Sequence, residues 1–294
     1  MIKKSNYKLK KWISTIIHKL RNETWEFIRK YSPLSFHKCE NIVITFSGGM
    51  GAQMISAAIY YHLRENGKNV YADMSYFDKP PHKAVMGITA DISHWQWQLD
   101  YFDIYPESFE SLPKIHRSRY QVIFDGRRKT ELGLKALSSP TIRAYFDDLI
   151  PIDEILPMDI ISKYVCIHIR RGDYVNVASH LVPDKLFIDI AKKLSSLVNH
   201  LVIVSDSPIN EEFRIELPKE YSSITYLDSA DAITTHRVMR NARALVCSNS
   251  QFSLIAALLN TNALVIIPKK WFGKGNEELE IPINKLCSFQ IIDY

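Results

Sequence analysis

Residues 164–174 read YVCIHIRRGDY, an apolar run followed at once by two arginines, a glycine and a carboxylate. The apolar run predicts a buried strand, so the charged residues lie at its carboxyl end. Unpaired charges in that position would be costly to bury in a hydrophobic core. The stretch therefore predicts one edge of a site, whose candidate residues are His168, Arg170, Arg171 and Asp173.

Strand patterns alternate with helical patterns on both sides of this stretch. The predicted strands are 41–46, 69–72, 163–169, 200–205, 223–227, 244–248 and 263–267. The predicted helices of the second half are 184–198, 211–217, 230–242 and 251–259. This alternation is typical of α/β proteins with doubly wound parallel sheets, in which ligands bind outside the carboxyl ends of the strands.

Two further strands deliver polar residues to the same edge as the opening stretch. Strand 200–205 delivers Ser205 and Asp206 at its carboxyl end, and strand 244–248 delivers Ser248, Asn249, Ser250, Gln251 and Phe252 at its own. Arginine forks, hydroxyls and a helix amino terminus together are ligands for phosphate, and Asp206 has the reach to accept from a ribose or base. Two structural alternatives stay open: a plain helix cap at Ser248–Ser250, and a salt bridge from the arginines to Asp173.

A glycine-rich turn follows the first predicted strand, SGGMGAQM at residues 47–54. Gly48, Gly49 and Gly51 would let a ligand or a second domain approach the backbone closely, and the helix after the turn favours a negative group at its start. Met54 occupies the place of the third glycine in a dinucleotide fingerprint, so no dinucleotide site is predicted. A tight turn that needs glycine for its backbone is the alternative.

Residues 75–160 are rich in aromatic residues and proline, including Trp95, Trp97, Tyr101, Phe102 and Tyr105. Such rings either line an acceptor groove for a sugar or form ordinary core. The stretch 151–157, PIDEILP, is the predicted linker, which gives an acceptor-side domain at 39–157 and a donor-side domain at 158–294.

The net charge of +5 is unevenly distributed over the 294 residues. Residues 1–38 hold ten lysines and arginines against two glutamates, a net charge of +8, which leaves −3 for the rest. Apolar residues recur at helical spacing from Leu9 to Tyr31, which predicts a basic amphipathic helix. This arm either lies on an anionic membrane through residues 1–31 or packs on the protein body. The body is not basic, which argues against a nucleic-acid partner.

Several other site classes are excluded by the sequence. No apolar run approaches the roughly 18 residues of a membrane span. The four cysteines are widely spaced and are expected to be reduced, in a cytosolic protein. There is no Walker loop, no His/Cys metal spacing and no Asp-x-Asp pair, so no metal or other cofactor is expected.

The motif H-x-R-R-G-D-Y at 168–174 resembles that of the α-1,2-fucosyltransferase family of bacterial surface-polysaccharide enzymes, residue for residue. Three weaker matches fall in the same order, at 48–54, 204–207 and 248–253. With Trp271 after the sequence PKK at 268–270, the resemblance covers about residues 41–272 and leaves the arm outside. The chain departs from the family pattern at Ala52, Ser207 and the pair Leu254 and Ile255, where the family has Asn, Asp and two tryptophans.

The resemblance implies a GT-B-like fold of two Rossmann-like domains facing a cleft. It implies an inverting, metal-independent transfer of L-fucose from GDP-β-L-fucose to a hydroxyl, galactose O2, of a glycan or lipid-linked oligosaccharide. In that reaction Arg170 or Arg171 meets the charge on the departing GDP, and Asp173 is the predicted base, with Gln53 or a carboxylate in 75–160 as alternatives. The expected setting is O-antigen or capsule synthesis on the cytoplasmic face of the membrane. Use of another GDP-sugar, or a degenerate nucleotide-sugar-binding protein, are the alternative functions.

Overall fold

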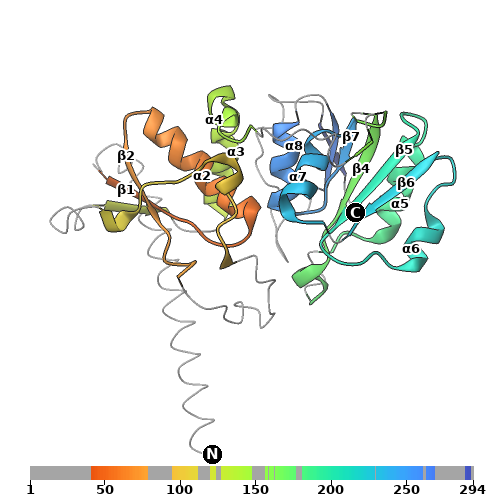
Figure 1. Ribbon diagram of the computed structural model, residues 1–294, viewed down its shortest axis with the longest axis horizontal. Helices are drawn as coiled ribbons and strands as arrows, with labels where there is room; N and C mark the ends of the chain where they lie inside the picture. The colour runs from red at the N-terminus through yellow and green to blue at the C-terminus, as the bar shows by residue number, and fades with distance from the viewer. Residues whose placement is uncertain are drawn as a thin grey trace, which may run out of the picture.

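A computed structural model describes most of both predicted domains (Figure 1). The described residues are 41–78, 95–111, 120–123, 127–147, 156–157, 159–161, 163–176, 181–228, 230–260, 263–268 and 289–292. The predicted amphipathic arm and most of the predicted linker lie outside these ranges. The domain boundary at 157/158 and the fate of the arm therefore stay predictions.

The first sheet is parallel and has three strands in the order β2-β1-β3. Its strands are β1 (Asn41–Thr45), β2 (Asn69–Asp73) and β3 (Tyr120–Ile123). Its helices are α2 (Met50–Glu65), α3 (Arg127–Ala136) and α4 (Pro140–Ala144), with short 3-10 turns η3 (Asp100–Phe102) and η4 (Phe109–Ser111). The first four residues of β1 are buried, as expected for a central parallel strand with an apolar run.

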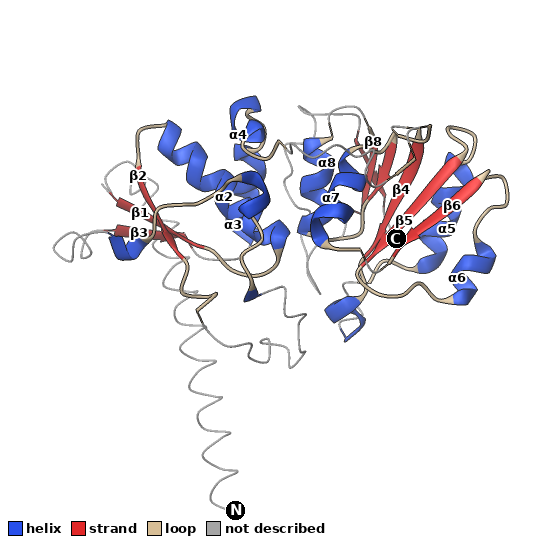
Figure 2. Ribbon diagram, viewed as in Figure 1, coloured by secondary structure: helices blue, strands red, loops and turns tan. Residues whose placement is uncertain are grey.

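The second sheet is parallel and has six strands in the order β6-β5-β4-β7-β8-β9 (Figure 2). Its strands are β4 (Tyr164–Ile169), β5 (His200–Ser205), β6 (Ser223–Leu227), β7 (Ala244–Val246), β8 (Leu264–Pro268) and β9 (Phe289–Ile292). Its helices are α5 (Asp184–Leu194), α6 (Glu211–Glu216), α7 (Ala232–Arg240) and α8 (Gln251–Leu259), and η7 (Gly172–Asn176) comes after β4.

Each sheet reverses its strand order next to its first strand. The chain runs outward from β4 to β5 and β6 and then returns to β7 on the other side of β4. In the same way β1 lies between β2 and β3. Ligands of such sheets bind at the carboxyl ends of the strands beside this switch point. The predicted fold class, two α/β units with parallel sheets, is confirmed, and β4 with its neighbours positions the predicted site.

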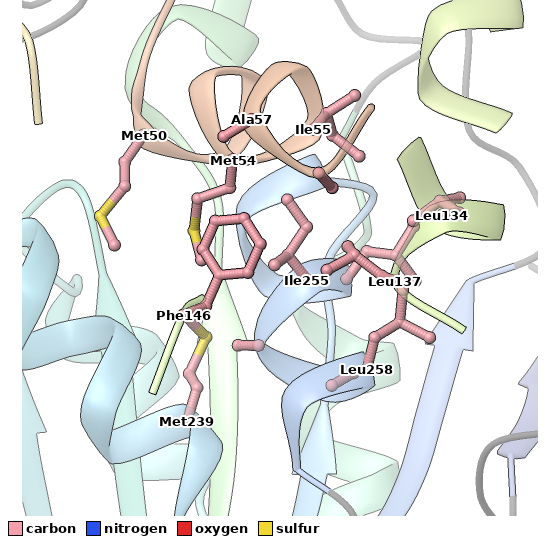
Figure 3. Close-up of a cluster of buried hydrophobic side chains, with 14 of the residues drawn as sticks. Met50, Met54, Ile55, Ala57, Leu134, Leu137, Phe146, Met239, Ile255 and Leu258 are labelled. Carbon is pink, nitrogen blue, oxygen red and sulfur yellow. The ribbon is translucent and has the colours of Figure 1, made fainter. Parts of the chain in front are cut away.

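A continuous hydrophobic core joins the two sheets (Figure 3). Helix α2 of the first unit packs against α8 of the second, and Met54, Phe146 and Ile255 are completely buried between them. A Cβ on Gly51 would lie 2.6 Å from the backbone nitrogen of Phe252, so only glycine allows this approach of the two helices. The prediction that the glycine-rich turn lets a second domain approach its backbone is therefore confirmed at Gly51.

Polar contacts reinforce the same junction. The Gln251 side-chain amide donates to Thr130 Oγ1 at 2.7 Å, which joins the start of α8 to α3. Arg240 at the end of α7 donates to the Phe146 carbonyl at 2.6 Å and pairs with Asp147 at 3.6 Å. These contacts and the shared core fix the start of α8 against the first unit.

The sequence located the larger elements and missed several short ones. The helix predicted at 184–198 ends at Leu194, and that at 230–242 spans only Ala232–Arg240. The missed elements are β3, α3, α4 and β9. None of the helices in the described ranges is long and apolar enough to cross a membrane. Cys166 and Cys247 are buried free thiols, while Cys39 and Cys287 lie outside the described residues.

Candidate active site

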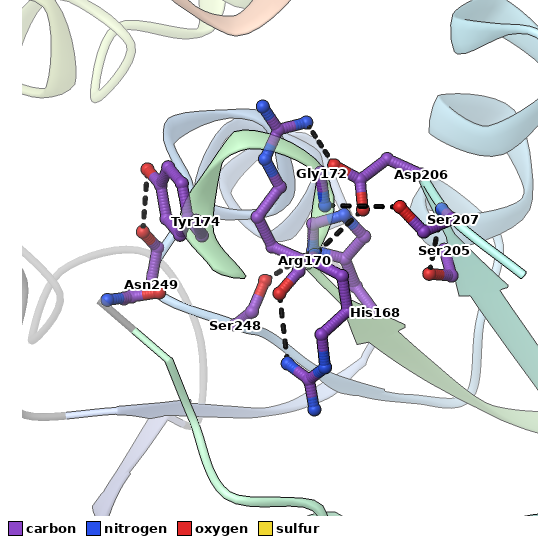
Figure 4. A network of polar contacts seen from close by, with 10 residues as sticks. His168, Arg170, Gly172, Tyr174, Ser205, Asp206, Ser207, Ser248 and Asn249 are labelled. Carbon is purple, nitrogen blue, oxygen red and sulfur yellow. Dashed lines mark hydrogen bonds and ion pairs between the residues drawn. The ribbon is translucent and has the colours of Figure 1, made fainter. Parts of the chain in front are cut away.

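His168 and Ser248 join the two strands that flank the switch point. His168 is the fifth residue of β4, and its Nδ1 lies 2.7 Å from the Oγ of Ser248, which comes after β7 (Figure 4). Burial, together with the positive charges of Arg170 and Arg171, lowers the pKa of His168 to about 3. The imidazole is therefore neutral near pH 7 and contributes hydrogen bonding without charge.

Arg170 is the charged side chain directly beyond this pair. Its guanidinium forms an ion pair with Asp206 at 2.6 Å and lies over the Tyr174 ring, 5.2 Å from the centroid. Its side chain is 20% exposed, so the charge is restrained by a carboxylate and a ring yet still reaches the surface. Such a fork is suited to a phosphate oxygen.

Asp206 holds the loop after β4 as well as the arginine. One carboxylate oxygen accepts from the Arg171 backbone N–H at 2.8 Å, and the other pairs with Arg170. The Gly172 N–H donates to Ser207 Oγ at 3.1 Å (Figure 4). Gly172 has a φ of 25°, which disfavours other residues, and a Cβ there would also press on the Asp206 carboxylate. Asp206 is thus a partner of the arginine loop, and its predicted contact with ribose or base stays a prediction.

Arg171 is directed to another part of the domain. Its guanidinium contacts the Asp184 carboxylate at the start of α5 and donates to the Val182 carbonyl at 3.3 Å. It also donates to the carbonyl of Arg170 at 2.9 Å. These contacts favour a structural role for Arg171, and they separate two adjacent arginines that the sequence left equivalent.

Asp173, the predicted base, lies on the 3-10 turn η7. Its side chain lies outside the described residues, so both its role as base and the alternative salt bridge to the arginines stay predictions. The next residue, Tyr174, covers Arg170 and donates from its hydroxyl to the Asn249 carbonyl at 3.5 Å. Tyr174 thereby connects the loop after β4 to the loop after β7.

Asn249 carries a buried and unpartnered amide. Its side chain is 3% exposed, and neither the amide nitrogen nor the amide oxygen has a hydrogen-bond partner. A buried amide without a partner is costly, typically by about 1–3 kcal/mol, which a bound ligand would remove. Ser250 is the N-cap residue of α8, but its hydroxyl makes no capping hydrogen bond. Ser250 therefore occupies the helix-cap position that the structural alternative predicted, but its side chain does not act as a cap.

Phe252 lies between two buried histidines. Its ring centroid is 5.9 Å from that of His168 and 5.3 Å from that of His236 on α7. Both ring nitrogens of His236 are buried without a partner, and burial, with the charges of Arg240 and His168, lowers its pKa well below the usual value. The sequence did not reveal His236 as part of the site, because a histidine inside an amphipathic helix carries no signal of its neighbours.

The glycine-rich turn carries no charged ligand of its own. Gly48 has a φ of 73°, which confirms the tight-turn interpretation there, and Gly49 is the N-cap of α2. Lys129 on α3 is 3% exposed and donates to the Thr45 carbonyl at the end of β1. The turn thus contacts α8 through Gly51, and Lys129 of α3 binds the end of the strand that precedes the turn.

Gln53 is completely buried, and its amide is used within the protein. Its nitrogen donates to the carbonyls of Gly48 and Gln96, both at 2.8 Å, and its oxygen accepts from the Gln98 N–H at 2.9 Å. Both amide N–H groups are therefore occupied. This geometry disfavours Gln53 as the orienting group for an acceptor hydroxyl and makes it a support for two loops.

The aromatic residues of the first unit divide into core and surface. Trp95 and Phe102 are buried, whereas Trp97 is half-buried. Tyr101 and Tyr105 are 57% and 64% exposed. Neither the groove nor the core interpretation therefore holds for all five rings.

The assembled site offers one restrained cation, neutral hydrogen-bonding groups and a helix start. No group of three or more His, Cys, Asp or Glu side chains placed to hold a metal occurs among the described residues. The site can bind a phosphate-bearing ligand and stabilise negative charge that develops on it.

The comparison with protein families supports a glycosyltransferase. The model of glycosyl transferase family 11 matches residues 152–280, which contain β4, β7, α8 and the whole Arg170 site. The resemblance found in the H-x-R-R-G-D-Y motif is thereby confirmed. No curated protein sequence matches the chain.

Solved glycosyltransferase structures are similar in outline. E. coli ADP-heptose lps heptosyltransferase II is 9% identical, covering 86% of this chain and 90% of that one, with a TM-score of 0.48. POFUT1 in complex with GDP-fucose is 15% identical, covering 76% and 94%, with a TM-score of 0.44. A family 9 glycosyl transferase from Veillonella parvula is 11% identical, covering 86% and 87%, with a TM-score of 0.47. At these scores the likenesses carry no argument about substrate.

Proposed function

We propose that this chain, a glycosyltransferase whose residues 152–280 match family 11, is a fucosyltransferase that uses GDP-β-L-fucose. It transfers L-fucose to galactose O2 of a glycan or lipid-linked oligosaccharide and inverts the anomeric centre. The observation that carries the proposal is Arg170, a cation held by Asp206 and Tyr174 at the switch point of a nucleotide-binding type of sheet.

The chemistry places the demand for charge stabilisation on the leaving group. When the acceptor hydroxyl attacks C1, the bond to the β-phosphate breaks and negative charge grows on GDP. Arg170 meets that charge, and an equivalent donor is typically worth about 3 kcal/mol of barrier. The sequence has no Asp-x-Asp pair for a metal clamp, so in this proposal the guanidinium serves in place of a divalent cation.

Neutral groups around Arg170 complete the donor site of the proposal. His168 and Ser248 can hydrogen-bond phosphate or sugar oxygens without adding charge, and the buried Asn249 amide gains partners when the donor is bound. Ser250, Gln251 and Phe252 form the start of α8, whose N–H groups favour an anion. Asp173 is the proposed base that takes the proton of the acceptor hydroxyl.

The basic arm gives the proposal a location. We place residues 1–31 on anionic lipid at the inner face of the cell membrane, where a lipid-linked acceptor for O-antigen or capsule is found. Deletion of residues 1–38 is expected to abolish binding to phosphatidylglycerol vesicles and to leave turnover of a soluble acceptor unchanged. Retained vesicle binding would contradict this location.

The test of the function is transfer itself. The full chain is incubated with GDP-fucose or GDP-mannose and with lactose or methyl β-D-galactoside, and the products are read by mass spectrometry and NMR. We expect fucose on galactose O2. Mannose transfer alone would favour another GDP-sugar, and binding of GDP without turnover of either donor would favour a degenerate binding protein.

A further inference from the structure

The support made by Gln53 joins the glycine-rich turn to a separate aromatic segment. Gln96 and Gln98, whose backbone groups it binds, lie 43 and 45 residues further along the chain. The same amide nitrogen binds the Gly48 carbonyl. Gln53 therefore fixes the segment around Trp97 relative to the turn that contacts α8.

Four rings form one cluster at this place, which we call the aromatic cluster: Tyr76, Phe77, Trp95 and Trp97. The rings of Tyr76 and Trp95 are nearly parallel, with an interplanar angle of 7° and centroids 6.2 Å apart. Phe77 meets Trp97 edge-on at 5.8 Å. Trp97 also packs on the completely buried Phe46 at 5.6 Å, so one side of it covers the core.

The cluster lies at the carboxyl end of the first sheet. Thr45 and Asp73 are paired as the last residues of β1 and β2, and the Phe46 N–H donates to the Asp73 carbonyl at 2.9 Å. Tyr76 and Phe77 come within four residues of the end of β2. The glycine-rich turn comes after β1, and it contacts the start of α8 through Gly51. The cluster is therefore on the same sheet edge as the turn that faces the donor half.

Three of the four rings are only partly buried, whereas Trp95 is buried and anchors the cluster to the body of the first unit. Tyr76, Phe77 and Trp97 are half-buried, and Gln96 between the two tryptophans is exposed. Asp73, the last residue of β2, is half-buried, and its carboxylate accepts from the Ser75 N–H at 3.0 Å, next to Tyr76 in the sequence. Fixed rings with a few amide and carboxylate groups are typical of small-ligand sites, and a pyranose offers an apolar C–H face and polar edges to such a surface.

We infer that the aromatic cluster is the acceptor subsite, that it takes a pyranose of the galactose type against Trp97, and that Gln53 is its positioning residue. This inference rests on the proposed function, since it names where the acceptor of that reaction binds. Gln53 contacts no substrate: it acts by holding the Gln96–Gln98 backbone at a fixed place relative to Gly48.

The first test separates acceptor binding from donor binding. Trp97→Ala is expected to raise the KM for lactose at least tenfold and to leave the KM for GDP-fucose within twofold, whereas Trp97→Phe keeps a ring and restores the lactose KM to within threefold of wild type. Tyr105→Ala, which removes a more exposed ring of the same unit, is the matched control and is expected to change neither constant. An unchanged lactose KM in Trp97→Ala, or an equal rise of both constants, would overturn the inference.

The second test addresses the positioning role. Gln53→Ala is expected to raise the lactose KM at least fivefold, with a smaller change in the KM for GDP-fucose. Ser56→Ala is its control, because Ser56 is also completely buried on α2 and its hydroxyl bonds only the Ala52 carbonyl at 2.9 Å. Equal effects of the two variants would show a general loss of stability and would overturn the role of Gln53.

A binding measurement keeps the inference separate from the proposed function. Saturation-transfer NMR with methyl β-D-galactoside needs no donor and no turnover. We expect saturation of the sugar C–H protons in wild type and its loss in Trp97→Ala. If wild type turns over no GDP-sugar but shows this signal, the proposed transfer is wrong, while the aromatic cluster is still a binding site for a galactose-type sugar. Absence of the signal in wild type overturns the subsite.

Discussion

At the carboxyl ends of the C-terminal strands, side chains are held by charge: Arg170 by Asp206, and Arg171 by Asp184. At the carboxyl ends of the N-terminal strands they are held by ring packing and by the single amide of Gln53. The first edge suits a diphosphate, whereas the second suits a neutral sugar. The two halves are built alike as parallel sheets, and in our proposal the different residues in the loops after their strands select different ligands.

The largest effect is expected at the charged edge. Arg170→Ala should lower kcat for GDP-fucose turnover by about 10²–10³, because the charge on the leaving phosphate then loses its donor. Steady-state kinetics with lactose as acceptor measure this directly.

A matched variant shows whether the effect belongs to the place or to the residue type. Arg214 also has a carboxylate partner, Asp228 at 3.2 Å, and a ring partner, Tyr226 at 4.0 Å, but it lies on α6. Arg214→Ala should leave kcat within twofold. Similar losses in the two variants would contradict the assignment of Arg170 to the leaving group.

The next largest effect is expected at the contact between α2 and the start of α8, where Gly51 packs on Phe252. Gly51→Ala should destabilise the protein by about 1–3 kcal/mol through overpacking, because the new Cβ meets the Phe252 backbone. It should also raise the KM for GDP-fucose, since the start of α8 is displaced. Denaturant unfolding and donor kinetics measure the two parts.

Gly67→Ala is the control for that variant. Gly67 has a φ of 72° and nothing within 4 Å of its added Cβ, so alanine costs about 1–2 kcal/mol of backbone strain alone. Its donor KM should not change. A rise in the donor KM of both variants would mean that stability, and not the α2–α8 contact, controls donor binding.

The buried histidine of the charged edge predicts a dependence of stability on pH. The pKa of His168 is lowered to about 3, so below its ordinary value of 6.5 the unfolded chain binds a proton that the folded chain does not. Stability is therefore intact above pH 6.5 and falls as the pH is lowered toward 3, by about 1.4 kcal/mol per pH unit for one such group.

His168→Gln tests this slope, because glutamine keeps a hydrogen-bonding side chain and does not titrate. Urea unfolding at pH 7, 6 and 5 should show a shallower loss of stability in the variant than in wild type. The pKa of His236 is lowered in the same direction and this residue remains in both proteins, so the slope should decrease without vanishing. Parallel slopes would contradict the buried neutral state of His168.

The smallest effect is expected at Arg171. Arg171→Ala removes the contact with Asp184 and should cost about 1 kcal/mol of stability, because the carboxylate is 40% exposed. Its kcat should fall less than fivefold. A loss of kcat as large as that of Arg170→Ala would show that Arg171 also stabilises the charge on the leaving group.

The sequence predicted the strands around the site well, because parallel strands read as continuous apolar runs that are easy to locate. Helix 251–259 and strands 200–205 and 223–227 match the observed bounds. Element β3 and helices α3 and α4 were missed, since they lie in a stretch without clear periodicity. The motif at 168–174 and its convergence with Ser248 were also predicted.

Side-chain partners could not be predicted from the sequence. The sequence does not distinguish Arg170 from Arg171. In the fold, the loop after β5 brings Asp206 to Arg170, and the position of α5 brings Asp184 to Arg171. Gln53 read as a possible catalytic group, yet its partners are 43 and 45 residues away. Long-range contacts of this kind depend on the packing of whole elements and leave no local pattern.

The most direct measurement is the hydrolysis of GDP-fucose by the full chain, with water as the only acceptor, monitored by NMR from the first minutes. Inverting transfer from GDP-β-L-fucose predicts release of GDP together with α-L-fucose as the first anomer, and loss of this signal in Arg170→Ala. Release of β-L-fucose first, or undiminished hydrolysis in Arg170→Ala, would contradict an inverting fucosyl transfer supported by Arg170.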